Sequence, residues 1–136
     1  MELSGGLRVD NTTSKRDNLD TGLSGIADET VVLGRASVSW SSLDNTALLY
    51  STFSQGFEPA DFSLSNLSAA NSLLRYDKET ADQIEIGYKK QLFENRLYLT
   101  VAAFYIDYRN RQFELQTVDP ATGLAVEGIV NVGDFA

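Results

Sequence analysis

The amino-acid sequence predicts an all-β protein, and more narrowly an antiparallel, up-and-down segment of a transmembrane β-barrel with about six strands. Three observations lead to this prediction. Apolar and polar residues alternate with period 2 along most of the chain, and helical periodicity is hard to find. Long and short connections alternate between the expected strands. One long expected strand carries an uncharged face about as tall as the apolar band of a membrane.

Six segments alternate like strands. They span residues 2–13, 31–40, 47–57, 80–92, 96–115 and 125–136. The connections between them run long, short, long, short, long, over residues 14–30, 41–46, 58–79, 93–95 and 116–124. Outer-membrane barrels have short periplasmic turns and long outer loops, whereas structureless loops of about twenty residues are uncommon in soluble sandwiches. Within the second long connection, residues 63–75 are expected to form a short helix or to stay irregular.

The fifth expected strand has one face without charge. Side chains of even number from Tyr98 to Tyr108 point to one side, and none of them is charged. The two tyrosines are ten residues apart, which is about 33 Å along a strand and about 25 Å in height at a tilt of about 40°. We therefore expect this face to contact lipid, with Tyr98 and Tyr108 as interfacial rings. Asp107 and Arg109 would then point into the barrel.

The fourth expected strand has one apolar and one charged face. The first holds Ile84, Ile86 and Tyr88, and the second holds Glu85 and Lys89. We expect the apolar face to contact lipid and the charged face to line the lumen. Because the FEN turn joins this strand to the fifth, we expect Tyr88 and Tyr98 to lie at one level, as an aromatic girdle requires.

These patterns leave a second fold class open. Alternating strands with tyrosines also occur in soluble barrels and sandwiches, and a membrane strand gives only a weak signal by itself. The alternative is therefore a small structural or binding β-barrel, or a soluble β-sandwich, with no transport role.

Composition limits the possible functions. The chain has 136 residues, enough for one domain, and contains neither cysteine nor histidine. Disulfides, zinc sites built on those residues and Ser-His or Cys-His catalysis are thereby excluded. The net charge of −8 argues against a nucleic-acid partner, because phosphate binding needs a basic surface.

The two ends of the chain favour a fragment. The first residues, MELSGGLRVD, lack the basic region and apolar run of a signal peptide and already alternate like a strand. The last residues, IVNVGDFA, stop within a strand pattern. We therefore expect residues 1–136 to be part of a longer protein.

Four stretches carry the most distinctive residues of the chain. They are GLRVDNTTSKRD (6–17), LYSTFSQGFEPADF (49–62), YDKETADQIEIGYKKQLFENRLYLTVAAFYIDYRNRQ (76–112) and IVNVGDFA (129–136). In this order they resemble the C-terminal half of the β-barrel of TonB-dependent outer-membrane receptors. The chain departs from the pattern of that family at Lys78, where proline is frequent, and at Ile84, where tyrosine is frequent.

The resemblance implies an architecture and a function. Receptors of this family have a barrel of about 22 strands and an N-terminal plug domain, so the chain would be a partial barrel without the plug and the remaining strands. They take up a scarce nutrient, above all a ferric siderophore and otherwise haem or a cobalamin-like molecule. The implied location is the outer membrane of a Gram-negative bacterium. The implied partners are membrane lipid, an extracellular small ligand such as a metal chelate, and TonB acting through the plug.

The sequence assigns no catalytic, cofactor-binding or metal-binding residue, and no enzymatic activity is expected. Four acidic residues in the first long connection could suggest a calcium loop, but their spacing fits none, which favours solvated charge; they are Asp17, Asp20, Asp28 and Glu29. Glu85 and Asp107 could suggest an acid/base pair, yet charges lining the lumen explain them better.

Three arginines lie where the expected strands leave the membrane. They are Arg75, Arg109 and Arg111. A guanidinium can contact an anionic ligand such as a ferric chelate, so these residues are the candidate ligand contacts. The simpler interpretation is rim charge that is paired or solvated.

Overall fold

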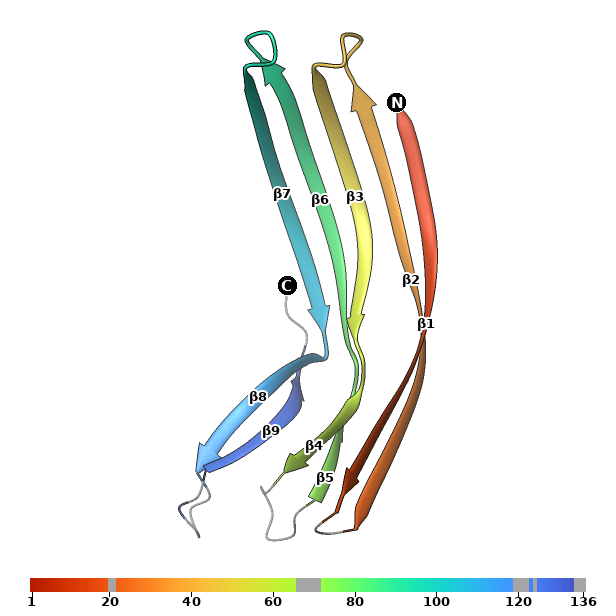
Figure 1. The fold of residues 1–136 in the computed structure, drawn as a ribbon, viewed down its shortest axis with the longest axis vertical. Coiled ribbons are helices and arrows are strands. Elements are labelled where there is room, and N and C mark those ends of the chain that lie inside the picture. The colour runs from red at the N-terminus through yellow and green to blue at the C-terminus, as the bar shows by residue number, and fades with distance from the viewer. Residues whose placement is uncertain (20–21, 66–71, 119–122, 124, 134–136) are drawn as a thin grey trace.

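The structure is a computed structural model that describes residues 1–19, 22–65, 72–118, 123 and 125–133. Its regular elements in these residues are all β-strands, labelled in Figure 1. The strands are β1 (Glu2–Asn18), β2 (Leu23–Ser41), β3 (Ala47–Glu58), β4 (Asp61–Ser65), β5 (Ser72–Tyr76), β6 (Glu79–Leu92), β7 (Leu97–Arg109), β8 (Arg111–Val118) and β9 (Ala125–Val132). The described part of the chain has no helix that could cross a membrane.

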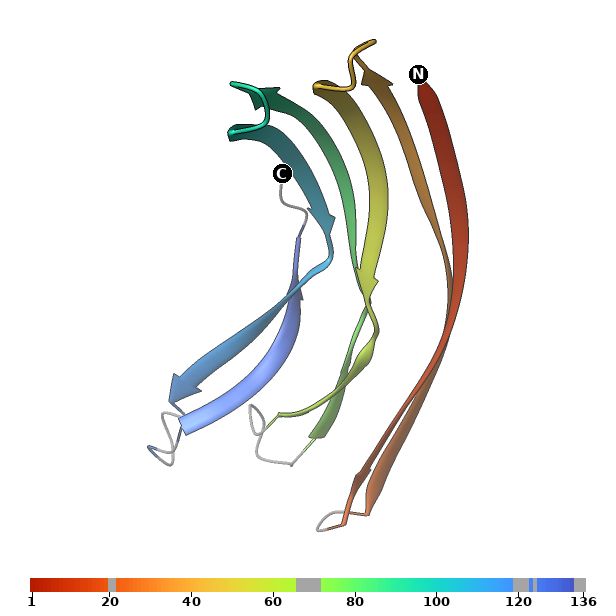
Figure 2. The same ribbon diagram turned by 45° about the horizontal axis from the view of Figure 1, so that its top comes forward.

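Five long strands form one antiparallel sheet in the order β1-β2-β3-β6-β7. The sheet is bent along its length, as Figure 2 shows. β4 and β5 form one separate hairpin, and β8 and β9 form another. The predicted all-β, antiparallel fold is confirmed. The six expected strands correspond to β1, β2, β3, β6, β7 and β9, although β9 pairs with β8 and not with the large sheet.

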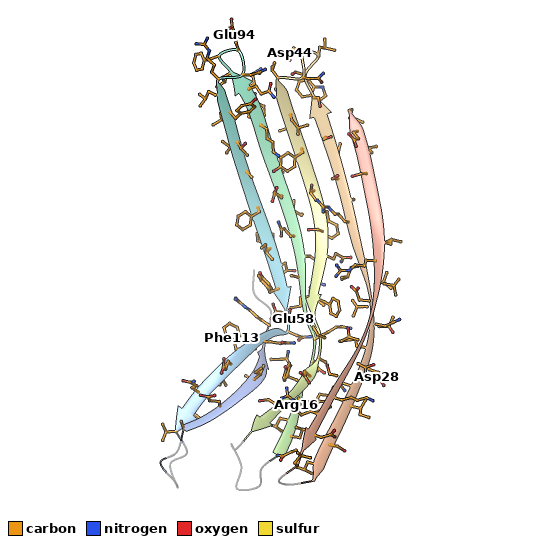
Figure 3. The ribbon with its side chains drawn as sticks, viewed as in Figure 1. Arg16, Asp28, Asp44, Glu58, Glu94 and Phe113 are labelled. Carbon is orange, nitrogen blue, oxygen red and sulfur yellow. The ribbon has the colours of Figure 1, made fainter. Side chains whose placement is uncertain are left out.

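The two ends of the sheet differ. One end, which we call the turn end, carries the short connections 42–46 and 93–96 and lies at the top of Figure 1. The other, which we call the loop end, carries the tips of the hairpins β1–β2, β4–β5 and β8–β9. Asp44 and Glu94 mark the two short turns in Figure 3. The short turns and the first two of the long connections therefore lie at opposite ends of the sheet, as predicted, but these long connections are largely paired strands and not loops.

The first long connection is not a loop. Residues expected there, 14–30, continue β1 and β2 as a paired ribbon down to the pair Asn18 and Leu23. Polar cross-strand contacts hold this ribbon: Thr13 donates to Asp28 at 2.8 Å, and Thr30 donates to Asn11 at 2.8 Å. The expectation of a loop was wrong because such polar pairs stabilise a ladder without producing an apolar alternation.

The second long connection is mostly a hairpin. Pro59 and Ala60 separate β3 from β4, and Asp77 and Lys78 separate β5 from β6. The expected short helix or irregular segment is wrong for residues 63–65 and 72–75, which are strands. Its middle, residues 66–71, lies outside the described residues.

The fifth expected strand, 96–115, is broken at Asn110. This residue has φ of 53°, in the left-handed region, where asparagine is tolerated better than most residues. β7 ends before it and β8 begins after it. The chain therefore bends away from the large sheet and enters the β8–β9 hairpin (Figure 1).

The turn between β2 and β3 is organised by Asp44. Its carboxylate accepts hydrogen bonds from the Ser42 hydroxyl, from the Thr46 hydroxyl at 2.8 Å and from the Thr46 amide at 3.2 Å. These donors lower the pKa of Asp44 from 3.8 to about 2, with the Ser42 hydroxyl as the largest cause. Asp44 thus closes the turn in its charged form.

We expect a carbon-detected NMR titration in detergent micelles to give a pKa of about 2 for Asp44. A pKa below the unfolded value means that the carboxylate stabilises the fold above about pH 4. That stabilisation is lost as the pH falls through about 2. Ser42→Ala should raise the pKa towards 3.8, because the strongest donor is gone. A pKa near 3.8 in the unmodified protein would contradict the assignment.

Candidate functional site

The strand register divides the large sheet into two faces. Pairing is continuous across β1, β2, β3, β6 and β7, so directly paired residues project to the same side. One row joins Trp40, Leu49, Tyr88 and Val101. The next row on the opposite face joins Ser39, Tyr50, Gly87 and Ala102. We call the face of Trp40 the outer face and that of Tyr50 the inner face.

The outer face is an exposed apolar surface. Its large side chains, all more than one third exposed, are Leu3, Leu7, Val9, Val32, Val38, Trp40, Leu49, Phe53, Ile84, Ile86, Tyr88, Leu97, Leu99, Val101 and Tyr105. On β7 this face has no charge from Leu97 until Asp107, ten residues along. That span is about 33 Å of strand and about 25 Å in height at a barrel tilt. An apolar surface of this extent needs lipid or a partner to cover it.

The inner face is polar and hollowed. A cavity of about 420 Å³ runs over β2, β3 and β6, and its lining is Arg35, Ser37, Leu48, Tyr50, Thr52, Ser54, Gln83, Glu85 and Lys89. Arg8 and Asp10 form an ion pair at 2.6 Å on the same face. The inner face therefore carries groups of both signs, with Arg35, Lys89 and Glu85 as the charged residues of the cavity lining.

The structure corrects the expected orientation of β7. Tyr98 pairs with Gln91 and Tyr108 pairs with Ala81, so both tyrosines lie on the inner face. The expectation that they share a lipid-facing surface with Tyr88 is wrong. Asp107 lies on the outer face instead, where it pairs with Asp82 at the loop end.

The error arises from the turn between β6 and β7. Leu92 pairs with Leu97 across the four residues 93–96, so even positions of β6 share a face with odd positions of β7. Three consecutive residues, Phe93, Glu94 and Asn95, adopt positive φ of 53°, 55° and 68° to close this turn. A shift of one residue in register reverses every side chain of a strand, and the sequence pattern alone left that register undetermined.

The β4–β5 hairpin folds over the inner face at the loop end. The side chains of Phe62 and Leu73 lie against Gly25 of β2, so close that an added Cβ there would be 2.7 Å from the Phe62 ring. Ala27 and Ala60 are buried beside them, with 6% and 3% of their surface exposed. The small residues let the hairpin approach the sheet, which identifies the inner face as the covered one.

Polar contacts fix the same hairpin. Lys78 forms an ion pair with Glu29 of β2 at 2.8 Å, and the Glu29 carboxylate also accepts from the Ala60 amide at 3.3 Å. Arg16 of β1 reaches Asp61 at 3.4 Å. The Glu29 side chain is mostly buried, so its pair with Lys78 is shielded from solvent more than the Arg16 pair.

The three candidate arginines lie in different surroundings. Arg109 is on the outer face, where its guanidinium contacts Asp82 at 2.8 Å and Asp107 at 3.4 Å. Arg111 lies over the rings of Tyr108 and Phe113, about 5 Å from each centroid. Arg75 is exposed on β5, with Asp77 4.0 Å away. The structure does not bring them together into one site.

The acidic residues do not converge either. Asp28 and Glu29 are neighbours along β2 and therefore point to opposite faces, Asp28 to Thr13 and Glu29 to Lys78. Glu85 is on the inner face and Asp107 on the outer face. Among the described residues, no three acidic side chains lie close enough to hold a metal ion.

Negative charge is concentrated at the loop end. Among the described residues, segments 10–31, 57–82 and 107–132 hold twelve carboxylates and six basic side chains, a net charge of −6, whereas the remaining segments hold four carboxylates and five basic side chains. Between the hairpins there, a pocket of about 260 Å³ is lined by Arg16, Phe62, Ser63, Glu114, Glu127, Gly128 and Ile129. This pocket is the candidate ligand-contacting surface of the chain.

Sequence reasoning missed a contact at the centre of the inner face. The Tyr50 hydroxyl donates to Glu85 at 2.7 Å, and Lys89 lies 5.6 Å from the centre of its ring. The ring crosses Gly87, where an added Cβ would be 2.2 Å from the Tyr50 Cζ atom. The sequence signal that could have indicated this contact is Gly87 itself, a glycine inside a strand pattern, which in the structure pairs directly with Tyr50.

We expect Gly87→Ala to displace the Tyr50 ring and break its hydrogen bond to Glu85. The free energy of unfolding in detergent, measured by urea titration, should fall by about 1–2 kcal/mol. Gly56→Ala in β3 is the matched control, because no atom lies within 4 Å of an added Cβ there. Equal destabilisation by the two substitutions would contradict the role given to Gly87.

Comparison with known proteins agrees with this geometry. The model of the family "TonB dependent receptor-like, beta-barrel" matches residues 1–134. The comparisons with curated proteins and with solved structures gave no match. The matched family consists of nutrient transporters of the Gram-negative outer membrane that interact with TonB, and not of enzymes. With almost its whole length matched, the chain belongs to the TonB-dependent receptors, as part or all of their β-barrel domain.

Proposed function

We propose that this chain forms a portion of the barrel wall of an outer-membrane receptor for a ferric siderophore. The observation that carries the proposal is the division of the sheet into an apolar outer face, charged only near its ends on β3, β6 and β7, and a polar, hollowed inner face. Such a division suits lipid on one side and a wet lumen on the other. Further strands would pair with the two edge strands of the sheet, β1 and β7. A plug domain would complete the receptor.

The orientation follows from the connections. Short turns in such barrels face the periplasm, so the turn end is periplasmic and the hairpins are extracellular. Trp40 and Tyr88 lie on one row of the outer face near the turn end. We assign them to the periplasmic interface, where rings with a polar tip are favoured. Asp82, Asp107 and Arg109 then mark the extracellular border of the apolar band.

The ligand would meet the loop end. Arg75 and Arg111 remain proposed contacts there, whereas Arg109 points away from the lumen and is neutralised by two carboxylates. The excess of carboxylates over basic groups in these segments repels a multiply anionic chelate. An uncharged ferric chelate, such as a hydroxamate complex, is therefore the proposed ligand class.

The lipid assignment can be tested with Trp40, which is the single tryptophan of the chain. In vesicles containing lipids with brominated acyl chains, we expect its fluorescence to be strongly quenched, with little effect from aqueous iodide. In the matched variant Trp40→Phe with Ser39→Trp, the ring moves to the inner face. We expect the opposite pattern there. Equal quenching by bromolipid in both proteins would overturn the assignment.

Transport can be tested in a Gram-negative host that lacks its own ferric-siderophore receptors. We expect the intact receptor to take up radioactive iron from an uncharged hydroxamate complex. Uptake should stop when a protonophore collapses the membrane potential, because energy reaches the receptor through TonB. An anionic catecholate complex should be taken up at least about tenfold less well, a preference of about 1.4 kcal/mol. Uptake of neither complex would reject the siderophore assignment.

A further inference from the structure

Two side-chain amides join the bases of two loop-end hairpins. Gln112 belongs to β8, and its amide nitrogen donates to the carbonyl oxygens of Pro59 at 3.0 Å and of Asp77 at 3.1 Å. Pro59 precedes β4 and Asp77 follows β5. One side chain from the β8–β9 hairpin therefore holds both ends of the β4–β5 hairpin.

Asn131, near the end of β9, completes the connection. Its amide oxygen accepts from the Asp77 amide at 2.7 Å, and its amide nitrogen donates to the Asp77 carbonyl at 2.8 Å. The same nitrogen donates to the carbonyl of Asn110 at 2.7 Å. Asn131 thus pairs with Asp77 as a neighbouring strand would, although Asp77 belongs to no strand.

The backbone bends where these contacts converge. Asn110, between β7 and β8, has φ of 53°, and the backbone N–H of Gln112 donates to the carboxylate of Glu79 at the start of β6 at 2.7 Å. Farther along the hairpins, the Ile129 amide donates to the Ser63 hydroxyl at 3.1 Å. The backbone groups of Asp77 and Asn110 at this bend lie outside the strands, so side chains take the place of ladder partners, and those bonded to Asp77 come from the β8–β9 hairpin.

We propose that Gln112 and Asn131 are positioning residues that couple the β4–β5 and β8–β9 hairpins into one moving unit. A displacement of either hairpin at the mouth of the receptor carries the other with it. Both amides are needed because each gives a pair of N–H donors to carbonyl oxygens, and only Asn131 also supplies an acceptor for Asp77. The coupling concerns the motion of the mouth and holds whichever ligand the receptor takes up.

The test uses the intact protein in detergent. Cysteine labelling is suitable because residues 1–136 contain no cysteine that would react with the label. Spin labels are placed at Leu74→Cys on β5 and Val118→Cys on β8, both of which are exposed. The double variant Gln112→Glu with Asn131→Asp keeps the shape of both side chains, removes their amide donors and adds two negative charges, a change whose effect the control below matches with one added charge. We expect the distribution of label distances, measured by pulsed electron paramagnetic resonance, to broaden by about twofold or more.

Gln116→Glu is the matched control. Its amide donates to Glu127 at 2.6 Å within the β8–β9 hairpin, so this variant loses a bond that does not join the two hairpins. The distribution should keep its width. An unchanged width in the double variant, or equal broadening in the control, would overturn the proposal.

A measurement on the unaltered protein covers the case in which the double variant does not fold. The backbone N–H of Asp77 lies outside the strands, and the acceptor that the structure describes for it is the side-chain oxygen of Asn131. We expect its hydrogen exchange to be slowed by about 100-fold or more relative to an unprotected amide. Exchange of Asp77 at the unprotected rate would show that the hairpins are not held together, and would reject the coupling.

Discussion

Everything in this structure depends on an unbroken antiparallel register from β1 to β7. Each of the four pairings proceeds without a bulge, so a side chain's face is fixed by its partner and not by its own strand alone. Each of the five strands alternates only moderately between apolar and polar residues, and pairing in this register combines them into one apolar and one polar surface. No single strand has this property by itself, because residues such as Ser51 and Tyr98 interrupt the pattern locally.

The same register explains where charge is tolerated. Along β3, β6 and β7 the charged side chains of the outer face lie only near its two ends, Lys90 towards the turn end and Asp82, Asp107 and Arg109 towards the loop end. Lys90 donates to Thr46 of the short turn at 2.7 Å, which holds its ammonium at the polar end. The inner face carries Glu85 and Lys89 halfway along the sheet, where both line the cavity.

The sequence predicted the fold class, the family and the order of long and short connections, because these depend on period-2 alternation and on turn chemistry that local residues encode. It failed at places decided by distant partners. The face of Tyr98 depends on how the turn 93–96 sets the register, and the ribbon over residues 14–30 depends on polar pairs across two strands. The contacts of Gln112 and Asn131 join positions far apart in sequence. Both residues lie within the stretches that resemble the family, but the resemblance does not show which backbone groups their side chains contact.

Loop-end hairpins in this chain are extensions of the wall and not separate loops. β1 and β2 continue through the border of the apolar band without interruption, whereas β3 and β7 break at Pro59 and Asn110 before their hairpins begin. The β1–β2 ribbon contacts the β4–β5 segment through the ion pair of Glu29 with Lys78. The side-chain amides of Gln112 and Asn131 then join the β4–β5 hairpin to the β8–β9 hairpin. The loop end is therefore held by side-chain contacts between its hairpins, whereas the large sheet is held by the backbone pairing of its own strands.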